Sequence, residues 1–261
     1  MPSEAKIFKD KGAALSNVGK YNESLGYFDK ALAINPNYSD ALFGKGVALY
    51  QLGRYIEAIA YFDKALAINP KDVHSLDGKG LALGALGNYS QAITFYDKAL
   101  AINPNSSKAL FNKGLDLLKL GKYNESITYT DKFLAISPND IYALNNKGTD
   151  LLGLGRSNEA IIYYDKALAI NPGYIVALTG KGAALNNMGK YDQAIAYYDK
   201  ALTINPHFSL ALANKSLALY NINHTRLITS IAIIVILGGA ATALIVIRKR
   251  RKQKKWFDTY W

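Results

Sequence analysis

Lysine recurs along this chain at a fixed interval of 34 residues, which makes it the first side chain to consider for chemistry. A lysine ammonium is a compact charge that can bind an anion or, when buried, act as a base. A catalytic or anion-binding site rarely needs seven copies, however, so we expect these lysines to have a structural role. They are Lys11, Lys45, Lys79, Lys113, Lys147, Lys181 and Lys215.

An aspartate followed by a lysine recurs with the same interval. We expect each recurring lysine to lay its stem along a helix–helix interface and to reach one of these aspartates, because long stems cover apolar surface while the ammonium stays in water. The alternative is a solvated face without pairing, and exposed pairs would contribute only about 0–1 kcal/mol each. The pairs are Asp29–Lys30, Asp63–Lys64, Asp97–Lys98, Asp131–Lys132, Asp165–Lys166 and Asp199–Lys200.

Enzymatic chemistry has no support in the rest of the sequence. The three histidines, His74, His207 and His224, are far apart and have no carboxylates at metal-binding spacing. The chain has no cysteine, and it has neither a phosphate-binding loop nor a nucleophile motif. We therefore expect a protein that is not an enzyme and has no catalytic residue, no cofactor and no metal site.

The net charge of +11 does not indicate nucleic-acid binding, because it is unevenly distributed. Residues 248–261 hold seven cations and only Asp258 against them, which leaves +5 for everything before them. The main part of the chain is mildly basic, so we expect no nucleic-acid partner.

The elements that position these side chains follow from six prolines spaced 34 residues apart. This interval is the length of a helix–turn–helix repeat, and six units fill residues 5–208. Counting positions 1–34 within each unit, a glycine at position 15 ends the first helix. The second helix ends at about position 30, before an asparagine–proline pair, or before Ser137–Pro138 in the fourth unit. The prolines are Pro36, Pro70, Pro104, Pro138, Pro172 and Pro206.

Glycine at position 8 lies inside the first helix, where it costs about 1 kcal/mol relative to alanine. Its repetition predicts close helix–helix approach. In the second helix, apolar positions such as Ala58, Phe62 and Ala65 predict a face that only neighbouring units can bury. The fourth unit has Thr130 in place of the aromatic residue and Phe133 in place of the small residue three positions later, which we interpret as a swap that conserves core volume.

This pattern resembles the tetratricopeptide repeat family: Gly at 8, Tyr at 17, Ala at 20, an aromatic at 24, Ala at 27 and Pro at 32. The departures include Ser157 at position 17, Ser24 and Ser126 at position 20, and lysine where the family usually has an apolar residue at position 7. The resemblance implies an all-α, right-handed superhelical solenoid of six units over 5–208, followed by a seventh first helix over 209–223. It also implies a concave groove lined by the first helices.

Positions 2, 5, 9, 12 and 13 would face this groove, with aromatic residues in the N-terminal half and asparagines in the C-terminal half. Asparagine offers donors and acceptors that suit a peptide backbone. The alternative is that these are simply polar residues on an exposed helix face. The expected groove residues are Phe43, Tyr50, Asp77, Phe111, Lys119, Asn145, Asn186, Asn187 and Asn221.

Residues 227–247 form an uncharged run of 21 residues, long enough to cross a membrane as one helix. The basic-aromatic tail at 248–261 would lie on an anionic lipid surface. The positive-inside bias places the tail in the cytoplasm and the repeats on the other side of the membrane. Residues 1–30 contain no apolar signal stretch, however, which favours a tail-anchored, single-pass protein with cytoplasmic repeats, and we expect the latter. The tail cations are Arg248, Lys249, Arg250, Arg251, Lys252, Lys254 and Lys255.

The sequence therefore favours a membrane-anchored, non-catalytic scaffold that binds an unidentified protein or peptide in its groove and membrane lipids through residues 227–261. One alternative is a structural or homo-oligomerising component of a membrane assembly. Another is a non-catalytic subunit of a transferase or secretion complex, which the sequence does not distinguish from the first.

Overall fold

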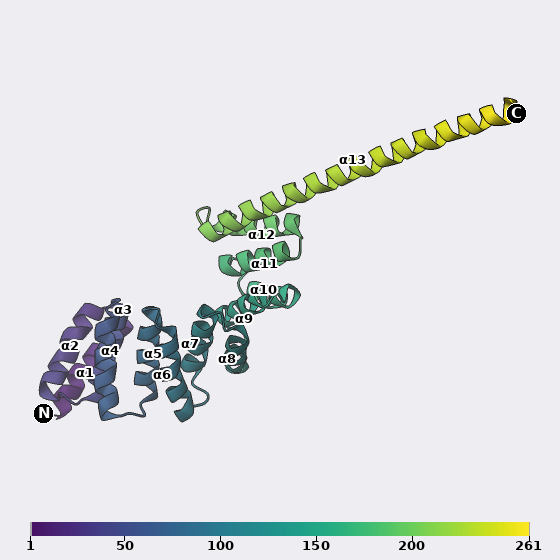
Figure 1. Ribbon diagram of the computed structural model, residues 1–261. Coiled ribbons are helices and arrows are strands. Elements are labelled where there is room, and N and C mark those ends of the chain that lie inside the picture. The colour runs from purple at the N-terminus through teal and green to yellow at the C-terminus, as the bar shows by residue number, and fades with distance from the viewer. Residues whose placement is uncertain (1, 261) are drawn as a thin grey trace. The chain divides into compact units, whose positions relative to one another are not determined.

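A computed structural model describes the backbone of residues 2–260 and the side chains of residues 3–233, 235 and 236. Every regular element in that part of the chain is an α-helix (Figure 1). The helices are α1 (Pro2–Asn17), α2 (Tyr21–Ile34), α3 (Ser39–Gln51), α4 (Tyr55–Ile68), α5 (Val73–Ala85), α6 (Tyr89–Ile102), α7 (Ser107–Lys119), α8 (Tyr123–Ile136), α9 (Ile141–Gly153), α10 (Ser157–Ile170), α11 (Ile175–Asn187), α12 (Tyr191–Ile204) and α13 (Ser209–Tyr260).

The helices belong to two compact units, Met1–Pro172 and Gly173–Trp261. In the first unit, each odd-numbered helix packs against the even-numbered helix that follows it, and that helix packs against the next odd one. The odd helices α1, α3, α5, α7 and α9 also contact one another in sequence, so they form a row (Figure 1). In the second unit, α12 packs between α11 and α13. The all-α, helix–turn–helix repeat solenoid is thus confirmed.

The two turns of each repeat are built as the sequence predicts. Gly53, between α3 and α4, has φ of +74°, a conformation that side-chain-bearing residues rarely adopt. At the other turn, the side chain of Asn69 accepts a hydrogen bond from the backbone N–H of Lys71 at 3.2 Å. This local bond turns the chain at the asparagine–proline pair and ends α4.

Glycine at position 8 makes room for the aromatic residue at position 24. A Cβ placed on Gly46 would lie 2.7 Å from the ring of Phe62, and one on Gly78 of the next repeat would lie 2.8 Å from it. Phe62 therefore lies between the backbones of two first helices and is almost fully buried. The predicted close approach of helices at this glycine is confirmed.

The fourth repeat fills the same space differently. Gly114 faces the smaller Thr130, and Phe133 is buried one turn later, where its ring packs 5.2 Å from that of Phe111. Both exchanged side chains are buried, as the proposed swap requires.

At least five of the seven recurring lysines pair with the recurring aspartates, and each pair joins a repeat to the one before it. Lys79 Nζ lies 2.5 Å from Asp63 and, on its other side, 4.3 Å from the centre of the Phe95 ring. The stem is largely buried while the aspartate is half exposed. The same ion pair forms in Lys45–Asp29, Lys113–Asp97, Lys147–Asp131 and Lys215–Asp199.

The last helix, α13, begins at Ser209, where a seventh first helix is expected, and continues past Asn223 to Tyr260. Across the described residues, no helix combines the length and the apolar character needed to cross a membrane. Within the expected span at 227–247, the side chains of residues 234 and 237–247 lie outside the described residues. The tail side chains at 248–261 also lie outside them.

Candidate functional site

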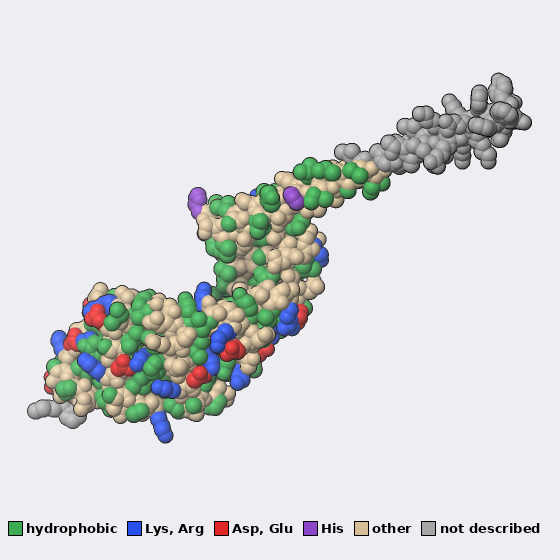
Figure 2. Space-filling model, viewed as in Figure 1, with side chains coloured by type: hydrophobic (Ala, Val, Ile, Leu, Met, Phe, Trp, Pro, Cys, Tyr) green, Lys and Arg blue, Asp and Glu red, His purple; other side chains and the backbone are tan. Residues whose placement is uncertain are grey.

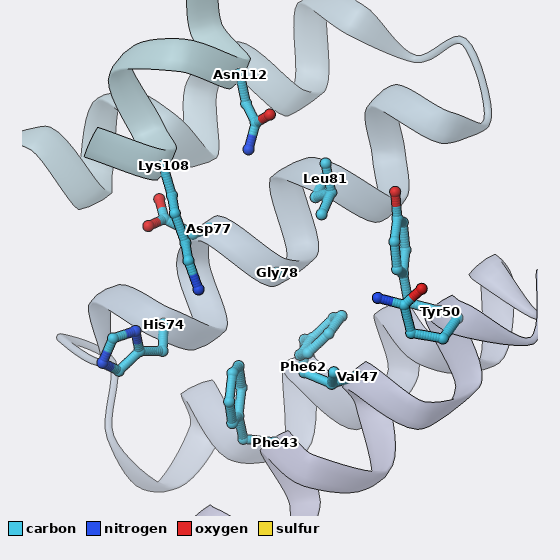
Figure 3. A pocket seen from close by; sticks show the side chains of 11 residues that line it. Phe43, Val47, Tyr50, Phe62, His74, Asp77, Gly78, Leu81, Lys108 and Asn112 are labelled. Atoms are coloured by element: carbon cyan, nitrogen blue, oxygen red, sulfur yellow. The ribbon is translucent and has the colours of Figure 1, made fainter. Parts of the chain in front are cut away.

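The row of first helices in the first unit contains an aromatic pocket of about 160 Å³ between α3, α5 and α7. Phe43 and Tyr50 come from α3, one on each side of Val47, and Leu81 comes from α5 (Figure 3). The ring of His74 lies 6.0 Å from that of Phe43. The pocket is mainly apolar, with Asp77, Lys108 and Asn112 on one side.

Asp77 supplies a buried carboxylate to this pocket. It is 5% exposed, and the hydroxyl of Ser106 donates a hydrogen bond to its Oδ2 at 3.0 Å. Its Oδ1 has no hydrogen-bond partner. Burial raises the pKa of Asp77, and the hydrogen bond from Ser106 opposes that rise. The free oxygen can accept a hydrogen bond from a bound group.

A second pocket, which we call the Asp116 pocket, adjoins the first and encloses about 320 Å³. It shares Tyr50, Leu81 and Asn112 with the aromatic pocket, and its own side chains include Tyr89, Tyr96, Asp116 and Lys119. Burial raises the pKa of Asp116 to about 7, although Lys119 acts in the opposite direction. We call the two pockets together the groove.

The groove has the size and lining to hold a ligand. Among the described residues, no group of histidine, cysteine, aspartate or glutamate side chains could hold a metal ion. The combination of aromatic walls with unpartnered carboxylate oxygens suits an apolar side chain that is flanked by hydrogen-bond donors.

Three models of the family described as "Tetratricopeptide repeat" match the chain, at residues 10–73, at 78–106, 141–174 and 175–208, and at 95–128. Together they cover well over half of its length. The chain belongs to the tetratricopeptide repeat (TPR) family. TPR repeats form protein–protein interaction scaffolds, which are typically non-catalytic.

Solved TPR structures share the fold. YrrB, a TPR protein "with an unusual peptide-binding site", has 24% identity and a TM-score of 0.62 over 72% of this chain and 97% of its own. PilW, a type IV pilus biogenesis factor, has 20% identity and a TM-score of 0.73 over 80% and 97%. PilF of Pseudomonas aeruginosa has 19% identity and a TM-score of 0.72 over 82% and 97%. A comparison with curated proteins found no match.

The structure brings four of the nine expected groove residues together. Phe43, Tyr50, Asp77 and Lys119 line the two TPR pockets. Phe111 instead packs on Phe133, and Asn145 is buried on α9 with its amide oxygen unpartnered; neither lines either pocket.

The remaining three expected residues, Asn186, Asn187 and Asn221, lie on α11 and α13 of the second unit. The described pocket of that unit is lined by other residues, among them Tyr191, Asp192 and Arg226. A role for the asparagines in binding stays a prediction.

Sequence reasoning missed Asp116 and Gly84. Asp116 occupies position 10, where other repeats have a buried alanine such as Ala48 or Ala82, so that position was not among those expected to face the groove. The signal was an acidic residue at a position that the repeat pattern reserves for a small one. Gly84 occupies position 12, where the preceding repeat has Tyr50.

Charge elsewhere on the first unit is mixed. In the face shown in Figure 2, acidic and basic side chains alternate over α1–α10 without a broad region of one sign.

Proposed function

We propose that this chain is a membrane-tethered adaptor that recruits a partner protein by holding a segment of it in the groove of the first unit. The observation that carries the proposal is that the groove combines an apolar pocket with buried carboxylate oxygens that have no hydrogen-bond partner. Aromatic side chains line an open pocket, and two carboxylates, Asp77 and Asp116, each keep a buried oxygen without a partner. A bound peptide would cover the rings and supply the missing donors.

Binding by the groove can be tested with paired variants in the full chain. Phe43→Ala and Tyr50→Ala remove the aromatic walls, and Ile56→Ala removes an exposed apolar side chain on α4 as a control. After photo-crosslinking in native membranes, the two groove variants should lose the partner that wild type and Ile56→Ala retain. Equal crosslinking by all four proteins would contradict a binding role for the groove.

The membrane tether rests on the apolar character of α13. Its described side chains from Leu227 to Ile236 include six large hydrophobic residues, each more than half exposed. Uncharged residues continue to Ile247 in the sequence. Such a run is suited to lipid, and the following cations are suited to an anionic lipid surface.

Fractionation tests the tether directly. The full chain should stay with membranes during alkaline carbonate extraction, whereas a variant with Ile231, Ile233 and Val235 changed to aspartate should be released. Release of the wild-type chain would contradict the tether. Protease protection of sealed vesicles then decides the side on which the repeats lie, and cytoplasmic repeats are the sequence-based expectation.

A homo-oligomeric role is the second candidate, and one observation favours it. Leu212 and Leu219 of α13 are 44% and 43% exposed, whereas Leu42 and Leu49 at the same repeat positions are almost fully buried. A second copy could cover this face. Light scattering in detergent should then give a dimer that Leu212→Glu dissociates, and a monomeric wild type would remove this candidate.

A further inference from the structure

Asp116 differs from the equivalent residues of the other repeats in a way that points to a bound cation. It lies on α7 at position 10, it is 6% exposed, and its Oδ2 has no hydrogen-bond partner. The carboxylate packs against α5 at Gly84, where an added Cβ would lie 2.9 Å from Oδ2. Gly84 therefore leaves the space that both the carboxylate and the adjoining pocket occupy.

Asp150, at the same position in the next repeat, provides an internal comparison. It is fully buried, and the hydroxyl of Ser126 lies 2.7 Å from its Oδ2. Ser126 is at position 20 of the preceding repeat, and the residue that corresponds to it for Asp116 is Ala92. Oδ1 of Asp150 is also without a partner. Asp116 differs in that it lacks the serine that contacts Asp150 and in that it lines a pocket.

The surroundings of Asp116 favour a positively charged occupant. Tyr50, Tyr89 and Tyr96 line the same pocket, and aromatic faces attract ammonium and guanidinium groups. A buried carboxylate without a partner is unfavourable, and a cation with N–H donors relieves this cost more than a neutral donor does. Burial without a partner also raises the pKa of Asp116 to about 7.

Lys119, which also lines the pocket, does not serve as the cation that pairs with Asp116. It lies one turn after Asp116 on α7 and is exposed. Among the described residues it forms no ion pair with Asp116, whose Oδ2 stays unpartnered. An exposed lysine can turn outward when a ligand enters.

We propose that the Asp116 pocket binds the lysine or arginine side chain of the partner segment held in the groove, while a neighbouring apolar side chain of that segment occupies the aromatic pocket. The inference rests on the proposed function, since it names the chemistry of the segment that the groove recruits. The two pockets adjoin at Tyr50, Leu81 and Asn112, so a single short segment can reach both.

The test measures binding of labelled nonapeptides to the full chain in detergent by fluorescence polarisation. The peptides have an alanine–glycine backbone, one leucine, and one variable residue placed one to four positions from it. The variable residue is arginine, lysine, citrulline or glutamate. Arginine and lysine peptides should bind at least ten-fold more tightly than citrulline and glutamate peptides at the best spacing.

Two variants and one control locate the effect. Asp116→Ala introduces the residue that every other repeat except the fifth has at position 10. Ala92→Ser supplies a serine equivalent to the Ser126 that contacts Asp150, and serine also occupies this position at Ser24. Each should reduce the preference for arginine over citrulline about ten-fold. Asp150→Ala should leave the preference unchanged, and circular dichroism verifies that all variants are folded.

The outcomes separate the two proposals. Equal binding of citrulline and arginine peptides, tighter binding of glutamate peptides, or an unchanged preference in Asp116→Ala would overturn the cation site while leaving a peptide-binding groove in place. If no peptide binds at any spacing, both the cation site and the groove as a peptide-binding surface are overturned.

Discussion

Ser126 joins two neighbouring repeats through Asp150: its hydroxyl oxygen lies 2.7 Å from Oδ2 of Asp150 and 2.8 Å from the carbonyl oxygen of Gly114. A serine hydroxyl carries a single proton. Both contacts are therefore hydrogen bonds at the same time only when Asp150 is protonated and donates to Ser126. Burial, which raises the pKa of Asp150 to about 7, is consistent with this arrangement.

The raised pKa of Asp150 predicts a pH dependence of stability. The group has a pKa of about 7 in the folded chain and an ordinary value of 3.8, so the folded state binds more protons between these pH values. The free energy of unfolding should therefore fall as the pH rises from about 4 to about 7 and then level off. Asp150→Ala should flatten this slope and raise the thermal midpoint at pH 8 more than at pH 5, as followed by circular dichroism. A midpoint gain that is equal at both pH values would contradict the assignment.

The contact between Gly46 and the Phe62 ring predicts opposite effects for two glycine-to-alanine changes. Gly46→Ala should destabilise the first unit by about 1–3 kcal/mol because the new Cβ overlaps the ring. Gly26→Ala is the matched control: Gly26 also lies inside a helix, α2, but no atom lies within 4 Å of its added Cβ. It should stabilise the helix by about 1 kcal/mol. Urea unfolding measures the free-energy change of both variants. Destabilisation by Gly26→Ala would contradict the assignment, because the added methyl group has no atom to overlap at that position.

The lysine–aspartate pairs should stabilise mainly through the lysine stem. The side chain of Lys113 is 7% exposed and its Nζ lies 3.9 Å from the centre of the Tyr129 ring, whereas Asp97 is 52% exposed. Asp97→Asn should cost no more than about 1 kcal/mol. Lys113→Ala should cost more, since it also removes stem packing and the contact with the ring.

Lys113→Met separates charge from packing in the same experiment. Methionine keeps most of the stem, so its cost should lie close to that of Asp97→Asn in urea unfolding. If Lys113→Met were as costly as Lys113→Ala, the charge rather than the stem would carry the stabilisation.

The cap of α5 predicts a smaller, local effect. The Asp72 carboxylate accepts a hydrogen bond from the backbone N–H of Ser75 at 3.0 Å. Asp72→Ala should cost about 0.5–2 kcal/mol. The equivalent change Tyr38→Ala before α3 removes no side-chain cap, so its cost reflects apolar packing alone. Hydrogen exchange at the first turn of α5 should increase in Asp72→Ala only.

The repeat architecture could be predicted from the sequence because each structural requirement recurs with the 34-residue interval. Glycine at position 8, the aromatic at position 24 and the lysine at position 7 each repeat often enough to reveal a common cause. The features of the groove that do not recur could not be predicted in this way. Asp116 is an exception at position 10 and Gly84 is an exception at position 12. The contact between these two residues is visible only in the fold, because the 34-residue interval does not relate one position to another.

Phe111 was expected to face the groove but lines neither pocket, and the reason is related. Phe111 occupies the position that Phe43 and Asp77 hold in the second and third repeats, where both line the aromatic pocket. The ring of Phe111 instead packs 5.2 Å from that of Phe133, one of the two exchanged residues on α8. A position-by-position reading of the repeat cannot detect such a compensation, because it involves two helices of the same hairpin.

Each aspartate that closes a lysine pair belongs to the repeat immediately before it, so every ion pair of this kind spans one junction and no more. If a complete 34-residue segment were removed, the lysine of the repeat after the deletion would therefore meet the aspartate of the repeat before it, and the same ion pair could form. The gene can lengthen or shorten such an array by unequal recombination without creating an unmatched charge at the new joint.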